Sequence, residues 1–283
     1  MVTGLTRAGR GAGAVDQSAG PPSADKRRAS GRYIPARRAV TSIVVVLAAW
    51  EVIIRVFHVS KLTIVSPSEI AIAFKNDVVD GSLQHNLSIS MTQFSLGFLA
   101  AAGVAIPLGL WLGESRRARQ YSDPWLVGLY STPSVALAPL FIVTLGFGLG
   151  AHVSVIALTA FFPIVINTMD GVLAVDRTLR EVGVAFRANK REAFLRIALP
   201  ASLPYIFTGL RLGLARGLVG VVVADLFGAT GGIGYQILNA AQAFNTAEVF
   251  VGVAVLAGFG IFFTVVLKYV QHRLTPWSEV HGH

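Results

Sequence analysis

The sequence predicts an all-α integral membrane protein with six transmembrane helices. Of its 283 residues, 53% are hydrophobic and only 14% are charged, whereas soluble domains carry about a quarter charged residues. The charges gather in clusters, and the apolar stretches between them are about 20 residues long, enough for a helix to cross the roughly 30 Å core of a bilayer. A soluble helix would need charged residues along one face of these stretches.

Residues 1–38 are predicted to form a basic cytoplasmic tail, and their Gly-, Ser- and Arg-rich composition indicates disorder. The first span holds Glu51 and Arg55, which lie four residues apart on one helix face and are expected to neutralise each other. This apolar run is too long for a signal peptide, so we expect an uncleaved span. A transmembrane domain of residues 39–273 and a C-terminal tail of residues 274–283 complete the organisation. The six predicted spans are residues 40–56, 87–112, 125–146, 153–172, 206–227 and 249–269.

Prolines interrupt three of these spans: Pro107 in the second, Pro133 and Pro139 in the third, and Pro163 in the fourth. Membrane helices tolerate proline, so ordinary kinks are one interpretation. Broken helices that line a pathway are the other, and the third span is the strongest candidate. The Gly- and Ala-rich stretches 96–109 and 209–220 predict close approach between helix backbones.

The distribution of Lys and Arg predicts the orientation. The N-terminal tail holds eight of these residues, the loop at 114–123 holds three, the loop at 174–204 holds six, and the end of the last span holds two. With six spans, all these segments fall on one side, and the opposite loops hold only Lys61 and Lys75. Because basic loops stay inside, both termini are expected to be cytoplasmic in a bacterial plasma membrane.

The loop at 174–204 is longer than a simple connection requires. Its composition predicts two short amphipathic helices at the membrane face. Such a pair either binds anionic lipid headgroups or docks another protein, and composition alone leaves both possibilities open.

Several chemistries are excluded by the residue content. The chain has no cysteine, which excludes disulfides and thiolate metal sites. Its six histidines show no metal-ligand spacing and are interpreted as interfacial or solvated, and no phosphate-binding GxxxxGK[ST] loop is present. We therefore expect no catalytic residues, no cofactor, no metal and no nucleic acid on this chain.

Polar residues within the spans are candidates for lining a pathway, although such residues more often join helices to one another. Arg216 and Asp225 are nine residues apart, so about half a turn separates them and neither can neutralise the other within the helix. Arg216 is a candidate for helping an anion across. The pathway candidates are Thr132, Ser134, Asn167, Thr168, Arg216 and Asp225.

Motifs in the loop and the spans resemble a known family. The segment Leu179–Asn189 followed by Leu199-Pro200 is similar to the EAA loop of binding-protein-dependent ABC permeases, with Glu181 and Gly183 at the family spacing. Arg187 stands where the family usually has glycine, which implies either a more regular backbone or a strained one. Trp50-Glu51, Ser66-Pro67-Ser68, Ile106–Gly109 and Gly232–Tyr235 further resemble the nitrate, sulfonate and taurine subfamily.

The resemblance implies the permease fold of a type I ABC importer. The loop would be a cytoplasmic coupling helix between spans 4 and 5 that seats in an ATPase groove, and ATP and Mg would be bound by that partner ATPase. A second permease copy, an extracytoplasmic solute-binding protein and the lipid bilayer would be the other partners. The solute would be a small oxyanion or organic acid such as a sulfonate, taurine or nitrate. The coupling residues implied are Glu181, Gly183, Arg187, Ala188, Leu199 and Pro200.

Two other classes of membrane protein are less consistent with this sequence. A secondary transporter or channel without an ATPase would be favoured by inverted repeats or by further carboxylates within the spans, and neither is found. A membrane enzyme would need a nucleophile and base pair or a metal constellation, and the sequence offers none.

Overall fold

The computed structural model describes residues 36–57, 60, 62–176, 178–179, 181 and 185–276. Every regular element within these residues is helical. Five helical stretches are long and apolar enough to cross a membrane, and a bent pair of shorter helices makes a sixth if both halves count as one span. The predicted all-α membrane fold is therefore confirmed. The elements are α1 (Ala36–Phe57), α2 (Pro67–Val79), α3 (Ser82–Glu114), α4 (Arg116–Ser131), η1 (Ser134–Leu137), α5 (Ala138–Leu145), α6 (Leu149–Leu173), α8 (Lys190–Ala193), η2 (Phe194–Ala198), α9 (Leu199–Leu226), α10 (Ile233–Gln242) and α11 (Thr246–Leu274).

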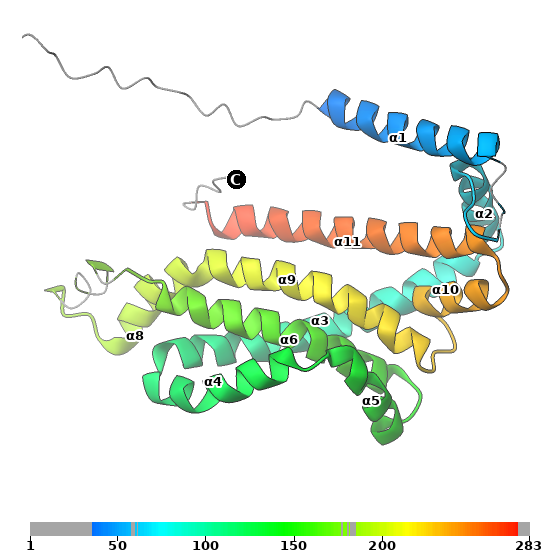
Figure 1. The fold of residues 1–283 in the computed structure, drawn as a ribbon. Helices are drawn as coiled ribbons and strands as arrows, with labels where there is room; N and C mark the ends of the chain where they lie inside the picture. The colour runs from blue at the N-terminus through cyan, green and yellow to red at the C-terminus, as the bar shows by residue number, and fades with distance from the viewer. Residues whose placement is uncertain are drawn as a thin grey trace, which may run out of the picture.

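Helix α6 forms the centre of the bundle, with α3 and α9 packed against it (Figure 1). Glycines bring these helices close together, as the sequence predicts. A methyl group on Gly109 of α3 would lie 2.7 Å from the carbonyl oxygen of Val165, and one on Gly213 of α9 would lie 2.7 Å from Cγ1 of Ile164. Without side chains at these positions, the backbones approach to distances that maximise van der Waals contact, which is the main force between helices in lipid.

The contact register fixes the direction of each helix. Along α3, Gly97, Gly109 and Gly113 face Ile156, Thr168 and Val172 of α6 in the same order, so α3 and α6 run parallel. Along α9 the order is reversed: Gly209 faces Asn167, whereas Gly220 faces Thr159. Helix α9 is therefore antiparallel to α6.

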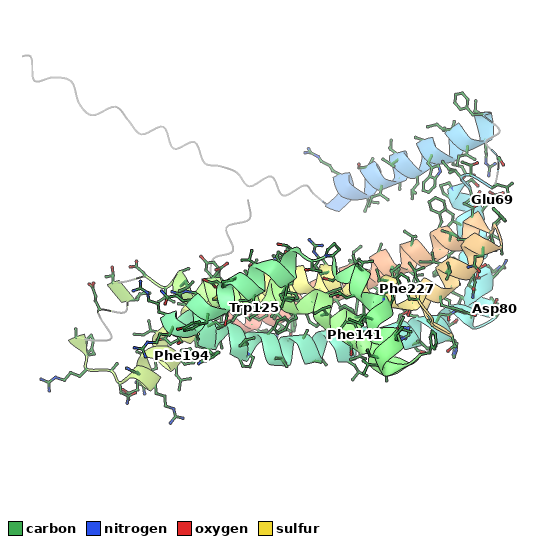
Figure 2. All side chains as sticks on the ribbon, turned by 60° about the horizontal axis from the view of Figure 1, so that its bottom comes forward. Glu69, Asp80, Trp125, Phe141, Phe194 and Phe227 are labelled. Atoms are coloured by element: carbon green, nitrogen blue, oxygen red, sulfur yellow. The ribbon has the colours of Figure 1, made fainter. Side chains whose placement is uncertain are left out.

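The bundle has two ends that differ in structure. One end carries α8 and the turn between α3 and α4, and we call it the α8 end. The other carries α2 and α10, and we call it the α2 end (Figure 1). Figure 2 shows Phe194 at the α8 end, and Glu69 and Asp80 at the α2 end.

Helix α1 stands apart from the bundle along most of its length (Figure 1). None of its apolar window is buried, and Val44 and Ile53 remain 58% and 53% exposed. Its last turns are held by Trp50, whose ring lies 5.6 Å from that of Phe250, and by the polar contacts of Glu51.

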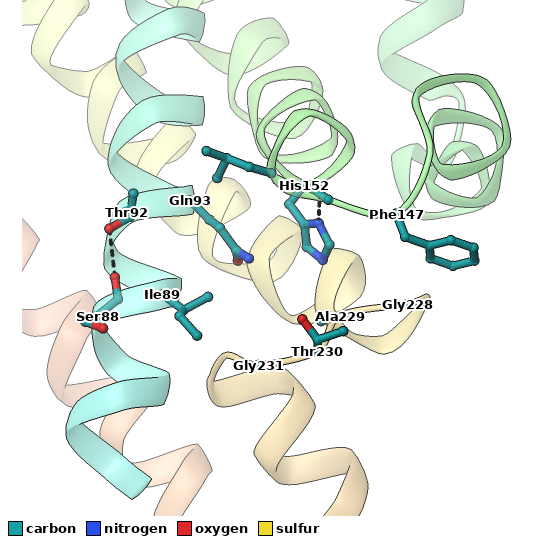
Figure 3. A pocket seen from close by; sticks show the side chains of 12 residues that line it. Ser88, Ile89, Thr92, Gln93, Phe147, His152, Gly228, Ala229, Thr230 and Gly231 are labelled. Atoms are coloured by element: carbon teal, nitrogen blue, oxygen red, sulfur yellow. Dashed lines mark hydrogen bonds between the residues drawn. The ribbon is translucent and has the colours of Figure 1, made fainter. Parts of the chain in front are cut away.

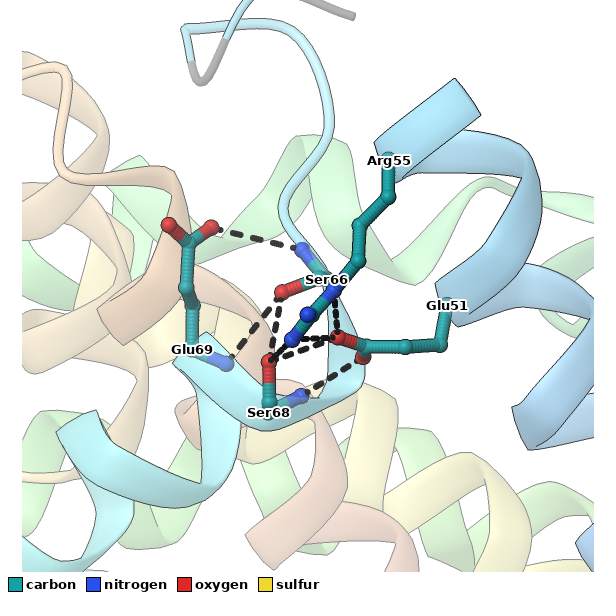
Figure 4. A network of polar contacts seen from close by, with 5 residues as sticks. All are labelled: Glu51, Arg55, Ser66, Ser68 and Glu69. Atoms are coloured by element: carbon teal, nitrogen blue, oxygen red, sulfur yellow. Dashed lines mark hydrogen bonds and ion pairs between the residues drawn. The ribbon is translucent and has the colours of Figure 1, made fainter. Parts of the chain in front are cut away.

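The Glu51 contacts join two sequence motifs that lie 17 residues apart. Glu51 accepts hydrogen bonds from the backbone nitrogen of Ser68 at 3.1 Å and from its hydroxyl at 2.8 Å, at the N-terminus of α2 (Figure 4). Arg55 donates to the same carboxylate at 2.7 Å, so the predicted pairing of Glu51 with Arg55 is confirmed. Ser66 and Glu69 complete a capping box at the start of α2. A carboxylate is favourable here because it meets free backbone N–H groups and the positive end of a helix dipole.

The third predicted span, residues 125–146, is not one continuous helix. Helix α4 ends at Ser131, and the chain continues through η1 and α5 after a bend of 86°. Pro133 offers no N–H and pushes the preceding Thr132 into an extended conformation with ψ of 130°, which ends α4. Of the two interpretations of this span, the broken helix is the one observed. Pro139 lies in the first turn of α5, where a missing N–H is tolerated.

The second amphipathic helix predicted before the fifth span is not separate from that span. Residues Lys190–Leu226 form one helical stretch of 37 residues. The π-helical turn η2 precedes Pro200, and in it the N–H of Leu199 donates to the carbonyl of Phe194. This wider turn relieves the clash that a proline makes with the carbonyl four residues before it. The helix therefore continues into the membrane without a break.

Candidate functional site

A cavity whose lining includes four serine and threonine side chains and one arginine lies beside the break in the third span. Its volume is about 410 Å³. Arg216 reaches it from α9, Thr159 and Phe162 reach it from α6, and the segment between α4 and η1 closes it with Thr132 and Ser134. The structure thus brings three of the predicted pathway residues, Thr132, Ser134 and Arg216, into one site.

Among the described residues that line this cavity, Arg216 alone is charged. Within the described residues, its guanidinium makes no hydrogen bond and no ion pair, and its side chain is exposed. A guanidinium stays protonated in proteins and is costly to leave alone at membrane depth. The site therefore has an unpaired positive charge with five N–H donors available for a solute.

Hydroxyl groups surround this charge. Ser131 and Thr132 donate to the carbonyls of Val127 and Gly128, at 2.8 and 3.1 Å, which satisfies carbonyls near the end of α4. These bonds help to make the break tolerable in a membrane, and each hydroxyl oxygen keeps its capacity to accept a hydrogen bond. The cavity can therefore hold a hydrated or anionic solute beside a broken helix.

The other predicted pathway residues lie outside this cavity. Asn167 donates to the carbonyl of Pro163 in its own helix at 2.8 Å, and its Cβ packs against Gly209. Thr168 is fully buried against Gly109. Both residues occupy helix interfaces, which is the more common role of polar residues in spans.

Asp225 lies at the α2 end of α9 with 1% of its surface exposed. It accepts hydrogen bonds from the backbone nitrogen of Gly234 at 3.1 Å and from the hydroxyl of Ser90 at 3.5 Å. As the half-turn offset predicts, it does not meet Arg216, and its partners come from other elements. His152 of α6 approaches it to 3.7 Å and is itself only 3% exposed. The interpretation of the histidines as interfacial or solvated is therefore wrong for His152.

One feature of the sequence pointed toward this pair of residues. An aspartate deep in an apolar span needs a partner, and His152 stands near the start of another predicted span. Only the antiparallel packing of α6 and α9 brings the start of one helix to the end of the other.

The loop predicted to couple to an ATPase lies at the α8 end (Figure 1). Glu181 and Arg187 are exposed, Ala188 is half-buried, and Leu199 and Pro200 begin α9. Gly183 lies outside the described residues. The exposed surface also includes apolar side chains, with Leu179 at 49% and Phe186 at 81% exposed.

The α2 end carries a buried acidic cluster that the sequence analysis missed. Asp77 of α2 accepts a hydrogen bond from the side chain of Gln236 at 2.9 Å, and the same amide reaches Glu248 of α11 at 3.5 Å. Burial, aided by the nearby charge of Glu248, raises the pKa of the Asp77 carboxyl. The cluster ties α2, α10 and α11 together and makes Asp77 a structural residue rather than an exposed loop carboxylate.

An apolar helical bundle with a broken span beside a charged cavity is the architecture of a membrane transport protein. Comparison with known families makes this specific. The family described as "Binding-protein-dependent transport system inner membrane component" matches residues 105–279, which is well over half of the chain. The chain belongs to this family and is the transmembrane permease subunit of an ABC importer.

Individual relatives cover most of the chain. The putative aliphatic sulfonates transport permease protein SsuC of Bacillus subtilis (strain 168) is 36% identical over 83% of this chain and 85% of its own length. The taurine transport system permease protein TauC of Escherichia coli (strain K12) is 31% identical over 90% of this chain and 95% of its own length. The nitrate import permease protein NrtB of Synechocystis sp. is 30% identical, with 73% and 75% covered. The resemblance to the nitrate, sulfonate and taurine subfamily is confirmed.

Proposed function

We propose that this chain carries a small oxyanion or organic acid, such as a sulfonate, taurine or nitrate, across the plasma membrane past Arg216. One observation carries the proposal: a guanidinium without a protein partner among the described residues lines a cavity of about 410 Å³ at a broken span. An anionic solute would supply the missing countercharge. The planar fork of arginine suits sulfonate, nitrate and carboxylate groups because two N–H donors can meet two oxygens.

The surrounding hydroxyls support an anion rather than a cation. Carboxylates would be expected around a cation, and none lines this cavity. Ser131, Thr132 and Ser134 can redirect their hydroxyl protons toward a solute as it passes. A pathway needs binding that is strong enough to admit the solute and weak enough to release it, and one arginine with hydroxyls meets this requirement. The predicted pathway roles of Asn167, Thr168 and Asp225 have no comparable support and stay predictions.

The pathway is proposed to form between two copies of this chain. In a single copy Arg216 is exposed, and α1 presents apolar side chains along its whole length with little of the bundle against them. A second permease subunit would cover the cavity from its open side and could pack against part of α1. The remaining apolar surface would face the lipid bilayer.

ATP hydrolysis and solute capture are proposed to come from partner proteins. An ATPase subunit would bind ATP and Mg and dock on the loop at 174–204 through Glu181, Gly183, Arg187 and Ala188, with Leu199 and Pro200 passing its movement to α9. An extracytoplasmic solute-binding protein would deliver the solute at the α2 end. The helical stretch Lys190–Leu226 supports coupling between the ATPase and the pathway, because it connects the loop to Arg216 as one continuous helical segment.

The proposal is tested by replacing Arg216 in the assembled transporter. We expect Arg216→Gln to reduce uptake of the solute by at least about tenfold, because one charge-assisted contact in the pathway is worth about 1.5–3 kcal/mol. Arg216→Lys keeps the charge and should retain part of the uptake. Co-purification of the ATPase should be unchanged in both variants. Normal uptake by Arg216→Gln would contradict a role in the pathway, and uptake that persists without ATP would favour a secondary transporter.

A further inference from the structure

A second cavity lies at the α2 end, away from Arg216. Its volume is about 360 Å³, and α3, the turn between α5 and α6 and the turn between α9 and α10 line it. Figure 3 shows the side chains of Gln93 and His152 extending toward each other from α3 and α6. Three buried polar atoms here have no hydrogen-bond partner among the described residues: Oε1 of Gln93, Nε2 of His152 and Oδ1 of Asp225.

The hydrogen bonds of His152 determine where its proton lies. Its Nδ1 is 2.7 Å from the carbonyl oxygen of Gly148 (Figure 3 shows this bond). Because a carbonyl oxygen only accepts, Nδ1 must carry a proton. In the neutral ring Nε2 is then a bare acceptor, and it faces Oδ1 of Asp225 at 3.7 Å.

The hydrogen bonds of Asp225 also show that a proton donor is missing between Asp225 and His152. Its Oδ2 accepts from the backbone N–H of Gly234 and from the hydroxyl of Ser90. Its Oδ1 has no donor and faces the imidazole. With a neutral histidine and an ionised aspartate, two lone pairs would oppose each other in a buried site, which is unfavourable. A single proton on either atom removes the conflict, and a small approach from 3.7 Å then completes a hydrogen bond between them.

A proton fits this site better than a bound molecule does. Each of the three unpartnered atoms is closed off from solvent, and His152 and Asp225 are 3% and 1% exposed. A molecule in the cavity would not reach them unless the helices moved. The described residues also hold no cluster of three or more His, Cys, Asp or Glu side chains that could bind a metal ion.

We propose that His152 and Asp225 hold one shared proton at neutral pH, and that this proton fastens α6 to the turn between α9 and α10. The same turn is tied to α3, because Asn86 accepts from the N–H of Gly232 and Ser90 accepts from that of Ile233. Loss of the proton would leave a net negative charge in the bundle and would push α6 and α9 apart at this end.

Other charged groups on the surrounding elements do not replace this proton. Among the described residues, α5 holds no titratable group, and Ser90 and Gln93, which face the pair from α3, do not ionise. Arg216 lies nine residues from Asp225 along α9. The remaining titratable groups toward this end are His85 on α3, Tyr235 on α10, Glu248 on α11, Glu51 and Arg55 at the end of α1, and Glu69, Lys75, Asp77 and Asp80 on α2.

The sign of the pH dependence follows from counting protons. Above about pH 6.5 a free histidine and a free aspartate in the unfolded chain hold no proton on the relevant atoms. The folded pair holds one. Stability must therefore fall as pH rises until the folded pair loses its proton.

The test compares thermal unfolding of the full chain in detergent between pH 6.5 and 9. The midpoint for the wild type should fall by about 3–5 °C for each pH unit above 6.5 until the folded pair loses its proton. Asp225→Asn should show no such fall, since its amide oxygen can accept from Gly234 while its NH₂ donates permanently to neutral His152. Asp170→Asn is the matched control, with an exposed aspartate at the α8 end of α6, and it should keep the wild-type profile. A flat wild-type profile, or an equally steep fall in Asp225→Asn, would overturn the proposal.

A direct measurement covers the case in which Asp225→Asn does not fold. Nitrogen NMR of the wild-type imidazoles, with His152→Gln to assign the signal, reports the state of each ring nitrogen. We expect Nε2 of His152 to be protonated or strongly hydrogen-bonded at pH 7. A free, unprotonated Nε2 at that pH would show that no proton is shared.

Discussion

At the scale of single residues, Arg187 adopts a backbone conformation that residues with a Cβ atom disfavour. Its φ angle is 54°, in the left-handed region that glycine adopts without cost. The sequence left two alternatives for this position, a more regular backbone or a strained one, and the strained one is observed. The turn before α8 therefore contains an arginine in a conformation that glycine would adopt without strain.

Replacing Arg187 by glycine should relieve this strain. A left-handed residue with a Cβ costs about 1–2 kcal/mol, whereas the greater freedom of glycine in the unfolded chain costs about 0.4–1 kcal/mol. We expect Arg187→Gly to be neutral or to stabilise by up to about 1.6 kcal/mol, measured by denaturant unfolding in detergent. Arg187→Ala serves as the control, because it removes the same side chain and keeps the Cβ. Equal destabilisation in both variants would show that the guanidinium matters more than the backbone.

At the scale of helices, the sequence predicted which elements exist better than how they are interrupted. Pro107 and Pro163 lie inside continuous helices, whereas Pro133 ends one. The residue type is the same, so the difference lies in the neighbours. The N–H of Thr132 turns to the carbonyl of Leu129, which leaves the Gly128 carbonyl without its backbone donor, and the hydroxyl of Thr132 satisfies that carbonyl. Such compensation depends on three-dimensional contacts that a proline count does not contain.

The positions of the glycines predicted helix contacts better than the prolines predicted helix breaks. A glycine permits close packing of two helix backbones at its own position. The stretch 96–109 predicted a close helix contact, and Gly97 and Gly109 provide one against α6. Gly103, in the same stretch, faces open space. The pairing of His152 with Asp225 could not be predicted in this way, since it depends on the antiparallel alignment of two helices far apart in sequence.

This difference predicts opposite effects for two identical substitutions in α3. Gly109→Ala would place a methyl group 2.7 Å from both the Val165 carbonyl and Cβ of Thr168, and should destabilise the chain by about 1–3 kcal/mol. Gly103→Ala meets no atom within 4 Å and should be neutral or stabilise by up to about 1 kcal/mol. Unfolding in detergent measures both. Equal effects would mean that α3 does not pack on α6 in this register.

The coupling loop gives a prediction at the same scale. If it seats in an ATPase groove, Glu181→Lys should insert normally but lose co-purification with the ATPase by at least about tenfold, because the new charge faces groups that bind a carboxylate. Glu181→Gln removes the charge without reversing it and should have a milder effect. Glu114→Lys makes the same charge change at the same end of the bundle, outside the loop, and should leave binding intact. Full binding by Glu181→Lys would place the docking site elsewhere.

At the scale of the whole molecule, the number of membrane crossings follows from helix direction. Helices α3 and α6 run parallel, as the register of Gly97, Gly109 and Gly113 against α6 shows. The chain must therefore return across the bundle between them, and only α4 with η1 and α5 is available to do so. The bent pair is thus a broken span rather than a loop that enters and leaves on one side. Counting it predicts six crossings, with both ends of the described chain on the same side of the membrane.

The distribution of charged residues predicts which end of the bundle faces the cytoplasm. Exposed arginines and lysines gather at the α8 end, where Arg117 and Lys190 lie, whereas Lys75 at the α2 end has Asp80 nearby in sequence. Because basic loops are retained inside, the α8 end should face the cytoplasm. Hydrogen bonding of Asp80 to the backbone of Ser82 lowers the pKa of its carboxyl, so this residue keeps its negative charge at the other surface.

Cysteine labelling tests this orientation cleanly, since the chain contains no native cysteine. Single cysteines at Asp80 and Asn245, both exposed at the α2 end, should react with a membrane-impermeant maleimide in intact cells. Cysteines at Arg117 and Lys190 should react only after the membrane is opened with detergent, which also shows that all four positions are reachable. Six crossings require Asp80 and Asn245 to give the same result, because four crossings lie between them. Labelling at 190 in intact cells would invert the orientation, and opposite results at 80 and 245 would show that the bent pair does not cross.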